Sequence, residues 1–150
     1  MKTAPHPVPE ACGKIIRVAA GSVAARAGLR AGDCLVEVNG LRVRDVIDVQ
    51  YAAAEEWVEF VVWRDGRLLR AEAERQYGDD IGLRFADDLF GGLRRCDNYC
   101  PFCFVKQLPA GLRPSLYIQD DDYRLSFLQG TFVTLINLTE EDWERLEEQR

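Results

Sequence analysis

Short apolar runs and tight-turn residues alternate through the first half of the chain, a pattern typical of a small antiparallel sheet. Asn39-Gly40 is the strongest turn signal, because both residues tolerate the positive φ of a type I′ hairpin. Asp65-Gly66 marks a second turn between two apolar runs. We expect a strand at 13–18 near the start of the domain. A first hairpin is expected at 32–43, and a second is expected from strands at 57–63 and 67–75.

Helical spacing interrupts this strand pattern twice. Ser22 is placed as an N-cap and Gly28 as a C-terminal stop around one or two helical turns. Behind Asp45, an aspartate suited to capping, apolar residues recur at helical intervals over residues 46–53. The combination predicts an α+β domain over residues 12–76.

Proline and the remaining pattern divide the rest of the chain. Residues 1–11 hold three of the six prolines and are expected to form an extended tail, while residues 77–95 form a connecting strand and loop. In the second half, "FVTLINL" at 132–138 predicts a buried strand, and Thr139 with Asp142 forms a capping box that begins a helix. Asp120, Asp121 and Asp122 are interpreted as a solvated acidic turn between strands, with Arg124 as a partner for them.

Composition narrows the class of protein. With 150 residues and 47% apolar side chains, the chain can form one ordinary domain or two small ones. The net charge of -6 and the absence of a basic block argue against a duplex nucleic-acid partner. The sequence shows no signal peptide and no run of about 18 apolar residues, so we expect a cytoplasmic protein that does not enter the membrane.

Three of the five cysteines, Cys96, Cys100 and Cys103, lie in "CDNYCPFCF". In a reducing compartment such a cluster indicates metal or redox chemistry before disulfides. A structural zinc site normally has four ligands, and the only histidine, His6, lies in the tail. Three thiolates on a 4Fe-4S cluster leave one iron open to a ligand. Cys12 and Cys34 lie outside the cluster and are predicted to be buried thiols that pack as small apolar side chains.

The segment "GSVAARAGLRAGDCLVEVNG" at 21–40 resembles the helix-turn-strand part of bacterial PDZ domains. These domains bind extended peptides at a sheet edge, and loop amides hold the peptide's terminal carboxylate. The corresponding loop here is "DDIGLRF" at 79–85, where Gly82 allows a close backbone approach. Asp79 and Asp80 would repel a carboxylate, so we expect a structural or intramolecular docking domain rather than an active carboxylate binder.

"CDNYCPFC" resembles the Cys-x3-Cys-x-aromatic-Cys signature of the radical S-adenosylmethionine (SAM) superfamily. The resemblance implies that Cys96, Cys100 and Cys103 hold a 4Fe-4S cluster whose open iron chelates SAM, which one electron cleaves to methionine and a 5′-deoxyadenosyl radical. It also implies that Phe102 lies near the adenine, although plain core packing is an equal alternative for that ring.

Residues 102–138 contain a Gln-Leu-Pro step, the run "DDDYRLSF" and a Gly-x-Phe-x-Thr-Leu strand. These motifs extend the resemblance to a prokaryotic family, largely uncharacterised, in which a PDZ-like domain precedes a radical SAM core. A complete eight-fold barrel needs about 250 residues, so residues 96–150 correspond to the first βα elements of an incomplete partial barrel. We expect an amino-terminal part of an iron-sulfur oxidoreductase that is inactive alone and takes electrons from a flavodoxin or ferredoxin. The alternative is a PDZ-type binding module with a non-catalytic zinc knuckle completed by a partner chain.

Overall fold

The computed structural model describes residue 9 and residues 11–150, so His6 and nearly all of the predicted tail lie outside the described residues. The chain divides into two compact units, the first ending at Gly91 and the second covering Gly92–Arg150. Each unit is described by itself below. The predicted domain limits at residues 76 and 95 stay predictions.

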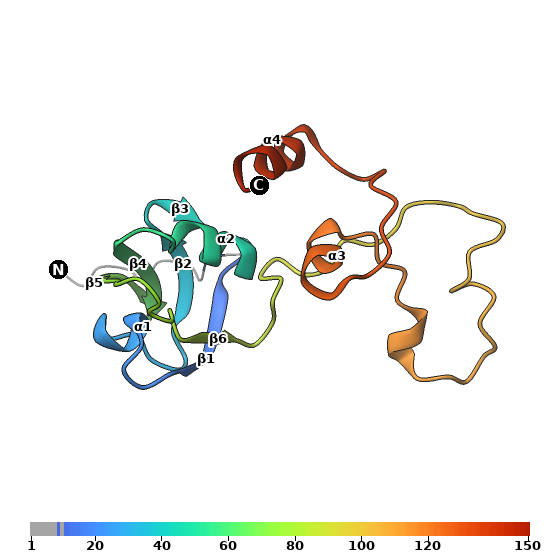
Figure 1. Ribbon diagram of the computed structural model, residues 1–150. Coiled ribbons are helices and arrows are strands. Elements are labelled where there is room, and N and C mark those ends of the chain that lie inside the picture. Colours follow the sequence, from blue (N-terminus) through green and yellow to red (C-terminus); the bar gives the residue numbers. More distant parts are fainter. Residues whose placement is uncertain (1–8, 10) are drawn as a thin grey trace. The chain divides into compact units, whose positions relative to one another are not determined.

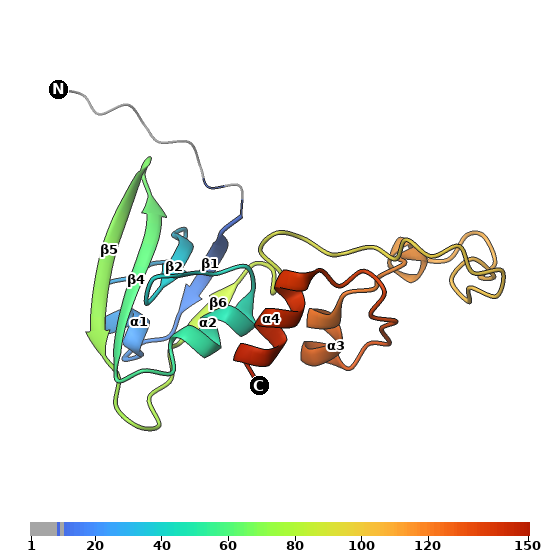
Figure 2. The same ribbon diagram turned by 90° about the horizontal axis from the view of Figure 1, so that it is seen from above.

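The first unit contains a six-stranded sheet whose paired strands are all antiparallel (Figures 1 and 2). The strand order is β5-β4-β2-β1-β6, and β3 pairs with β2 away from this path. The strands are β1 (Gly13–Val18), β2 (Cys34–Val38), β3 (Leu41–Arg42), β4 (Trp57–Arg64), β5 (Arg67–Glu74) and β6 (Leu83–Phe85). The last of these strands, β6, forms one edge of the sheet, so its outer side is where an added strand would pair.

Both predicted hairpin turns are confirmed. Asn39 and Gly40 have φ angles of 47° and 78° between β2 and β3, and Asp65 and Gly66 have 49° and 82° between β4 and β5. These positive angles are the ones that a type I′ turn requires. The Asn39 side chain also accepts a hydrogen bond from the Glu59 backbone N–H at 2.7 Å. The turn is therefore tied to the neighbouring strand β4 as well as to its own hairpin.

Two short helices, α1 (Val23–Arg26) and α2 (Val46–Ala52), accompany the sheet, as predicted. Ser22 caps α1 by accepting from Ala25 N at 3.2 Å, and Asp45 caps α2 by accepting from Ile47 N and Asp48 N at 3.1 and 3.0 Å. Each cap satisfies backbone donors that the first turn of a helix leaves without partners.

The core of this unit lies between the sheet and these helices. Phe60, Ile15 and Leu35 are among its fully buried side chains. Asp33 is buried as well and accepts two hydrogen bonds of 2.6 Å from the Arg64 guanidinium. Burial alone would raise the pKa of Asp33, but the bonds and charge of Arg64 lower it below its ordinary value. The sheet that carries the edge strand β6 thus packs on this core, and the buried ion pair joins Asp33 to β4.

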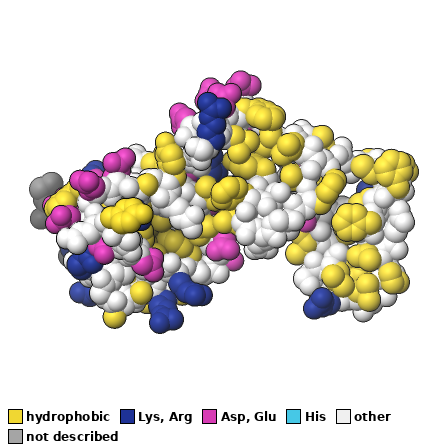
Figure 3. Space-filling model, viewed as in Figure 1, with side chains coloured by type: hydrophobic (Ala, Val, Ile, Leu, Met, Phe, Trp, Pro, Cys, Tyr) yellow, Lys and Arg dark blue, Asp and Glu magenta, His cyan; other side chains and the backbone are white. Residues whose placement is uncertain are grey.

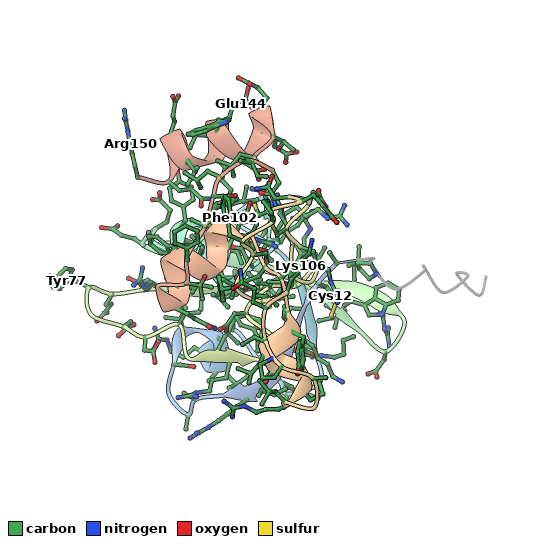
Figure 4. The ribbon with its side chains drawn as sticks, turned by 90° about the vertical axis from the view of Figure 1, so that its right-hand side faces the viewer. Cys12, Tyr77, Phe102, Lys106, Glu144 and Arg150 are labelled. Carbon is green, nitrogen blue, oxygen red and sulfur yellow. A yellow bond between two sulfur atoms is a disulfide. The ribbon has the colours of Figure 1, made fainter. Side chains whose placement is uncertain are left out.

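The prediction that Cys12 and Cys34 are buried free thiols is wrong. The two side chains form a disulfide with a Cα–Cα distance of 5.5 Å, and both residues are only partly buried (Figure 4). Cys12 immediately precedes β1, and Cys34 begins the neighbouring strand β2 opposite Lys14. Pairing of these two strands brings the sulfur atoms together, which the distance between the residues along the chain does not reveal.

The second unit contains helices and extended segments. It comprises the 3₁₀ helix η1 (Pro114–Tyr117) and the α-helices α3 (Tyr123–Gln129) and α4 (Glu140–Glu148). None of the helices in the described residues has the length and apolar character that a membrane crossing demands. Within this unit the described residues form one isolated bridge, Arg95 with Asp120, and no strand. The partial barrel is therefore not confirmed and stays a prediction.

The buried strand predicted at 132–138 is wrong. Its residues form no strand, Phe132 and Ile136 are exposed, and Leu135 has a φ of 62°. Instead, the Asp121 carboxylate accepts from Thr134 N at 2.6 Å and Thr134 Oγ1 at 2.7 Å. An apolar run becomes a buried strand only where a neighbouring strand pairs with it, and none of the described residues in this unit supplies one.

The solvated acidic turn predicted at Asp120, Asp121 and Asp122 is also wrong. Asp121 and Asp122 are buried, and Asp122 is the N-cap of α3. The predicted partner Arg124 is confirmed, because its guanidinium donates to both Asp122 carboxylate oxygens at 2.9 and 2.6 Å. Buried carboxylates need such partners, so this run is part of the interior of the second unit.

The capping box of α4 is confirmed and belongs to a larger buried network. Asp142 accepts from Thr139 N at 2.9 Å and from the Arg94 guanidinium at 2.5 and 2.7 Å. Tyr123 Oη lies 3.3 Å from Asp142 and 3.1 Å from Arg145 Nη1. One carboxylate thus joins α4 to α3 and to the chain segment that precedes the cysteines.

This network predicts that the second unit loses stability in acid. Burial raises the pKa values of Asp122 and Asp142, but their arginine partners and backbone donors bring the net pKa of each below its ordinary value. A carboxyl with a lowered pKa stabilises the fold above the unfolded-state pKa, about 3.9, and that stability is lost as the pH falls through the folded pKa. The urea midpoint should therefore be constant from pH 7 to 5 and fall below about pH 4.

The acid loss can be followed with Trp143, the tryptophan of α4. Phenylalanine at Trp57 and Trp63 leaves Trp143 as the remaining one of the three tryptophans. Its fluorescence then reports urea unfolding of the second unit at each pH. A midpoint that stays constant down to pH 2.5 would contradict the role given to the two carboxylates.

Candidate functional site

Cys96, Cys100 and Cys103 lie in one long connection between β6 and η1, which contains no helix or strand among its described residues. All three are free cysteines and partly buried. The Cys103 N–H donates to the Cys100 carbonyl at 3.2 Å, which closes a turn between these two residues. The three cysteines are thus partly accessible to solvent, and a backbone hydrogen bond orders the second half of the segment.

Gln119 joins the two ends of this cysteine segment. Its backbone carbonyl accepts from Cys96 N at 2.9 Å, and its side-chain Nε2 donates to Cys103 Sγ at 3.2 Å. Sequence reasoning missed this residue, because no motif or periodicity relates Gln119 to the cysteines. The chain brings it there through the adjacent bridge between Arg95 and Asp120.

The surroundings of Cys103 favour its thiolate form. The backbone amide of Lys106 lowers the pKa of this thiol below its ordinary value, and Gln119 adds to the effect, while partial desolvation opposes it. The thiolate is the form in which cysteine binds metals. Cys103 is therefore chemically suited to the ligand role predicted for it.

The structure does not gather the three predicted ligands around one point. Within the described part of the chain, no three or more histidine, cysteine, aspartate or glutamate side chains are grouped so that they could hold a metal ion. The donor set nevertheless fits an iron-sulfur cluster, because three free thiols on one irregular segment are the soft ligands that such clusters take.

Two buried acceptor atoms lie beside the start of the cysteine segment. Asp120 Oδ2 and Asn137 Oδ1 have no hydrogen-bond partner in the part of the chain that the structure describes. Asp120 bridges to Arg95, and Asn137 Nδ2 lies 3.5 Å from the Arg95 carbonyl oxygen. Acceptors without partners are costly when buried, and they suit a ligand that carries hydrogen-bond donors.

Phe102 is 78% exposed, so its alternative interpretation as a core residue is wrong. Tyr99 and Phe104 are exposed on the same segment, and Lys106 Nζ lies 4.4 Å from the centre of the Tyr99 ring. Apolar side chains are prominent on the visible face of this unit in Figure 3. The exposed rings are free to contact a ligand, and the contact of Phe102 with adenine stays a prediction.

The predicted carboxylate loop of the first unit is anchored on α1. The carbonyls of Asp80 and Ile81 accept from Val23 N and Ala24 N, each at 3.1 Å, and Gly82 has a φ of 74°. A Cβ atom at Gly82 would overlap the Ser22 side chain, so only glycine fits there. The close backbone approach predicted at Gly82 is therefore present in this loop.

The two acidic residues of this loop are already engaged. Asp79 pairs with Arg26 at 2.5 Å, and that hydrogen bond lowers the pKa of Asp79. Asp80 Oδ1 accepts from the backbone N–H of Gly82 at 3.0 Å. An amide that a peptide carboxylate would use is thus occupied by a carboxylate of the loop itself.

A pocket of about 610 Å³ adjoins the segment that leads into this loop. Arg75, the cation in its wall, donates to the Ala53 carbonyl at 2.7 Å and to the Asp79 carbonyl at 3.3 Å. The pocket is lined by Ala54, Glu55, Glu56, Arg75, Gln76, Tyr77 and Gly78. Two glutamates and an engaged arginine make this wall unfavourable for a terminal carboxylate.

Known proteins resemble both parts of the chain. The PDZ domain family matches residues 14–64, and the Radical SAM-like domain family matches residues 75–150, about half of the chain. Among solved structures, the PDZ domain of the SdrC-like protein from Listeria monocytogenes is 20% identical, with a TM-score of 0.41. That match covers 58% of this chain and 99% of the other. No curated protein matches.

The two family matches occur in the predicted order, a PDZ domain followed by a radical SAM part. The three cysteines lie inside the second match. The chain belongs to the Radical SAM-like domain family and carries a PDZ domain ahead of the matching region.

Proposed function

We propose that Cys96, Cys100 and Cys103 hold a 4Fe-4S cluster that binds SAM, as part of a radical SAM iron-sulfur enzyme. The observation that carries this proposal is the Cys-x3-Cys-x2-Cys spacing of three free thiols inside the region that matches the Radical SAM-like domain. The cluster, when bound, supplies one electron for the reductive cleavage of SAM. A flavodoxin or ferredoxin is the class of donor that the family resemblance suggests.

The residues of the chain would serve this cofactor in separate ways. The three thiolates supply the ligands and leave one iron for SAM. The exposed ring of Phe102 supplies a flat apolar surface for adenine. Asp120 and Asn137 offer acceptors for the donor groups of SAM, since each has a buried oxygen without a partner among the described residues.

Anaerobic reconstitution of the chain with iron and sulfide tests the proposal. We expect bound iron and acid-labile sulfide, a reduced cluster visible by electron paramagnetic resonance, and a changed spectrum when SAM is added. A colourless protein that binds one zinc ion and gives no SAM-dependent signal would support the alternative, a non-catalytic metal knuckle.

The PDZ domain supports a second function, the docking of a peptide or of another segment of the same protein. The observation that favours it is the edge strand β6, which begins immediately after Gly82 in the segment at 79–85. Because Asp80 already occupies the Gly82 amide, we propose docking through the strand edge rather than through a terminal carboxylate.

Titration with peptides that carry a free terminal carboxylate should therefore give dissociation constants of about 1 mM or weaker. Asp80→Ala frees the Gly82 amide and removes one negative charge, and we expect binding about tenfold tighter, the effect of one charge-assisted hydrogen bond. Asp87→Ala is the matched control, because it removes the same charge from an exposed residue that makes no described contact. Micromolar affinity of the unaltered chain would contradict the proposal.

A further inference from the structure

Gln119 makes hydrogen bonds to two of the three proposed ligands, although it is not a ligand itself. We propose that Gln119 is a positioning residue for the cluster: its side-chain amide donates a hydrogen bond to the sulfur of Cys103 and raises the reduction potential of the bound cluster. This inference rests on the proposed function. It adds a residue outside the cysteine signature that adjusts how readily the cluster takes up its electron.

The geometry separates two contributions of Gln119. Its backbone carbonyl accepts from Cys96 N at 2.9 Å, whatever side chain the residue carries. Its side-chain Nε2 donates to Cys103 Sγ at 3.2 Å. Among the described residues, Gln119 is the residue whose side chain donates a hydrogen bond to one of the three free thiols. A substitution at Gln119 can therefore remove the bond to sulfur and keep the backbone bond to Cys96.

The segment that carries Gln119 is well anchored. Its neighbour Asp120 bridges to Arg95, and the next residue, Asp121, donates its N–H to the Arg94 carbonyl at 3.2 Å. Arg94 N in turn donates to the buried Asp122 carboxylate at 2.9 Å. Residues 94–96 and 119–122 thus run together along several consecutive bonds, so the amide of Gln119 is supplied from a fixed backbone.

The direction of the effect follows from charge. Reduction adds an electron to the cluster, and part of that negative charge resides on the cysteine sulfurs. An N–H that points at a sulfur stabilises the reduced state more than the oxidised one, and hydrogen bonds to sulfur are among the factors that set cluster potentials. Loss of this donor should make the cluster harder to reduce.

Gln119→Leu keeps the approximate volume and removes both N–H donors. In a redox titration of the reconstituted chain, we expect the ratio of reduced to oxidised cluster at a fixed potential to fall by up to about tenfold, which equals about 59 mV for one electron. Gln107→Leu is the matched control, since Gln107 lies in the same segment and its exposed side chain makes no described contact. It should leave the potential unchanged.

A second measurement does not require the cluster. In the cluster-free, reduced chain, nuclear magnetic resonance should show the Gln119 side-chain amide protons shifted and slow to exchange, and Cys103→Ala should abolish both features. If no cluster assembles but this signature is present, the proposed function fails while the contact stands. The inference would be overturned by an unshifted Gln119 amide, or by equal reduction potentials in Gln119→Leu and the unaltered chain. If Gln119→Leu does not fold, Gln119→Met takes its place in the redox titration.

Discussion

Alanine at any one of Cys96, Cys100 and Cys103 is expected to abolish stable assembly of the 4Fe-4S cluster. These three are the free cysteines among the described residues, and two thiolates cannot hold a cubane against exchange with water and oxygen. Iron and acid-labile sulfide per chain, measured after anaerobic reconstitution and desalting, should fall from a full cluster to background in each of the three variants.

Cys12→Ala and Cys34→Ala provide the controls for this experiment. They remove the disulfide of the first unit, which closes a loop with a sequence separation of 22 residues, and should cost about 2–4 kcal/mol of stability. Cluster assembly should persist in both, since neither sulfur belongs to the predicted ligand set. Equal iron content in all five single variants would exclude the ligand assignment.

Asp142→Ala is expected to destabilise the second unit by about 3 kcal/mol, because it breaks a partly buried ion pair whose arginine is 33% exposed and also removes a helix cap. Asp142 is 1% exposed and accepts from Arg94, Thr139 and Tyr123. Its removal leaves the Arg94 guanidinium without its carboxylate and takes away the capping box of α4. Urea unfolding followed by Trp143 fluorescence, in the background with phenylalanine at Trp57 and Trp63, measures the loss.

Glu144→Ala is the matched control for this variant. Glu144 lies on the same helix, is exposed, and makes no described contact (Figure 4). It removes one acidic residue without disturbing the buried network, so the change in unfolding free energy should stay within about 0.5 kcal/mol. Equal losses in the two variants would show that the network does not hold α4 in place.

The first unit was predictable where its signals are local. Asn39-Gly40 and Asp65-Gly66 determine their hairpins through backbone angles that few residue pairs tolerate, and Ser22 and Asp45 cap helices through bonds to residues two or three positions away. The disulfide was missed because it depends on which strands become neighbours. That information lies in the tertiary structure and not in the spacing of the two cysteines.

The second unit was less predictable because its polar residues find distant partners. Asp122 accepts a bond from Arg94, 28 positions earlier, so a run of aspartates typical of a surface turn became buried. The run at 132–138 has the composition of a strand but no strand beside it among the described residues. At the candidate site, spacing identified the three cysteines, whereas Gln119 became visible only when the fold placed it beside them.

If the segment at 79–85 docks a partner as proposed, the hydrogen bond from the Gly82 amide to Asp80 affects which kind of partner it accepts. A carboxylate two residues away is an internal competitor whose effective concentration exceeds that of any free peptide terminus. A chain end therefore gains little advantage over the middle of a chain at this loop. Selection would then depend on the side chains that an extended segment places along β6, so a loop with no free terminus could compete on equal terms with a peptide tail.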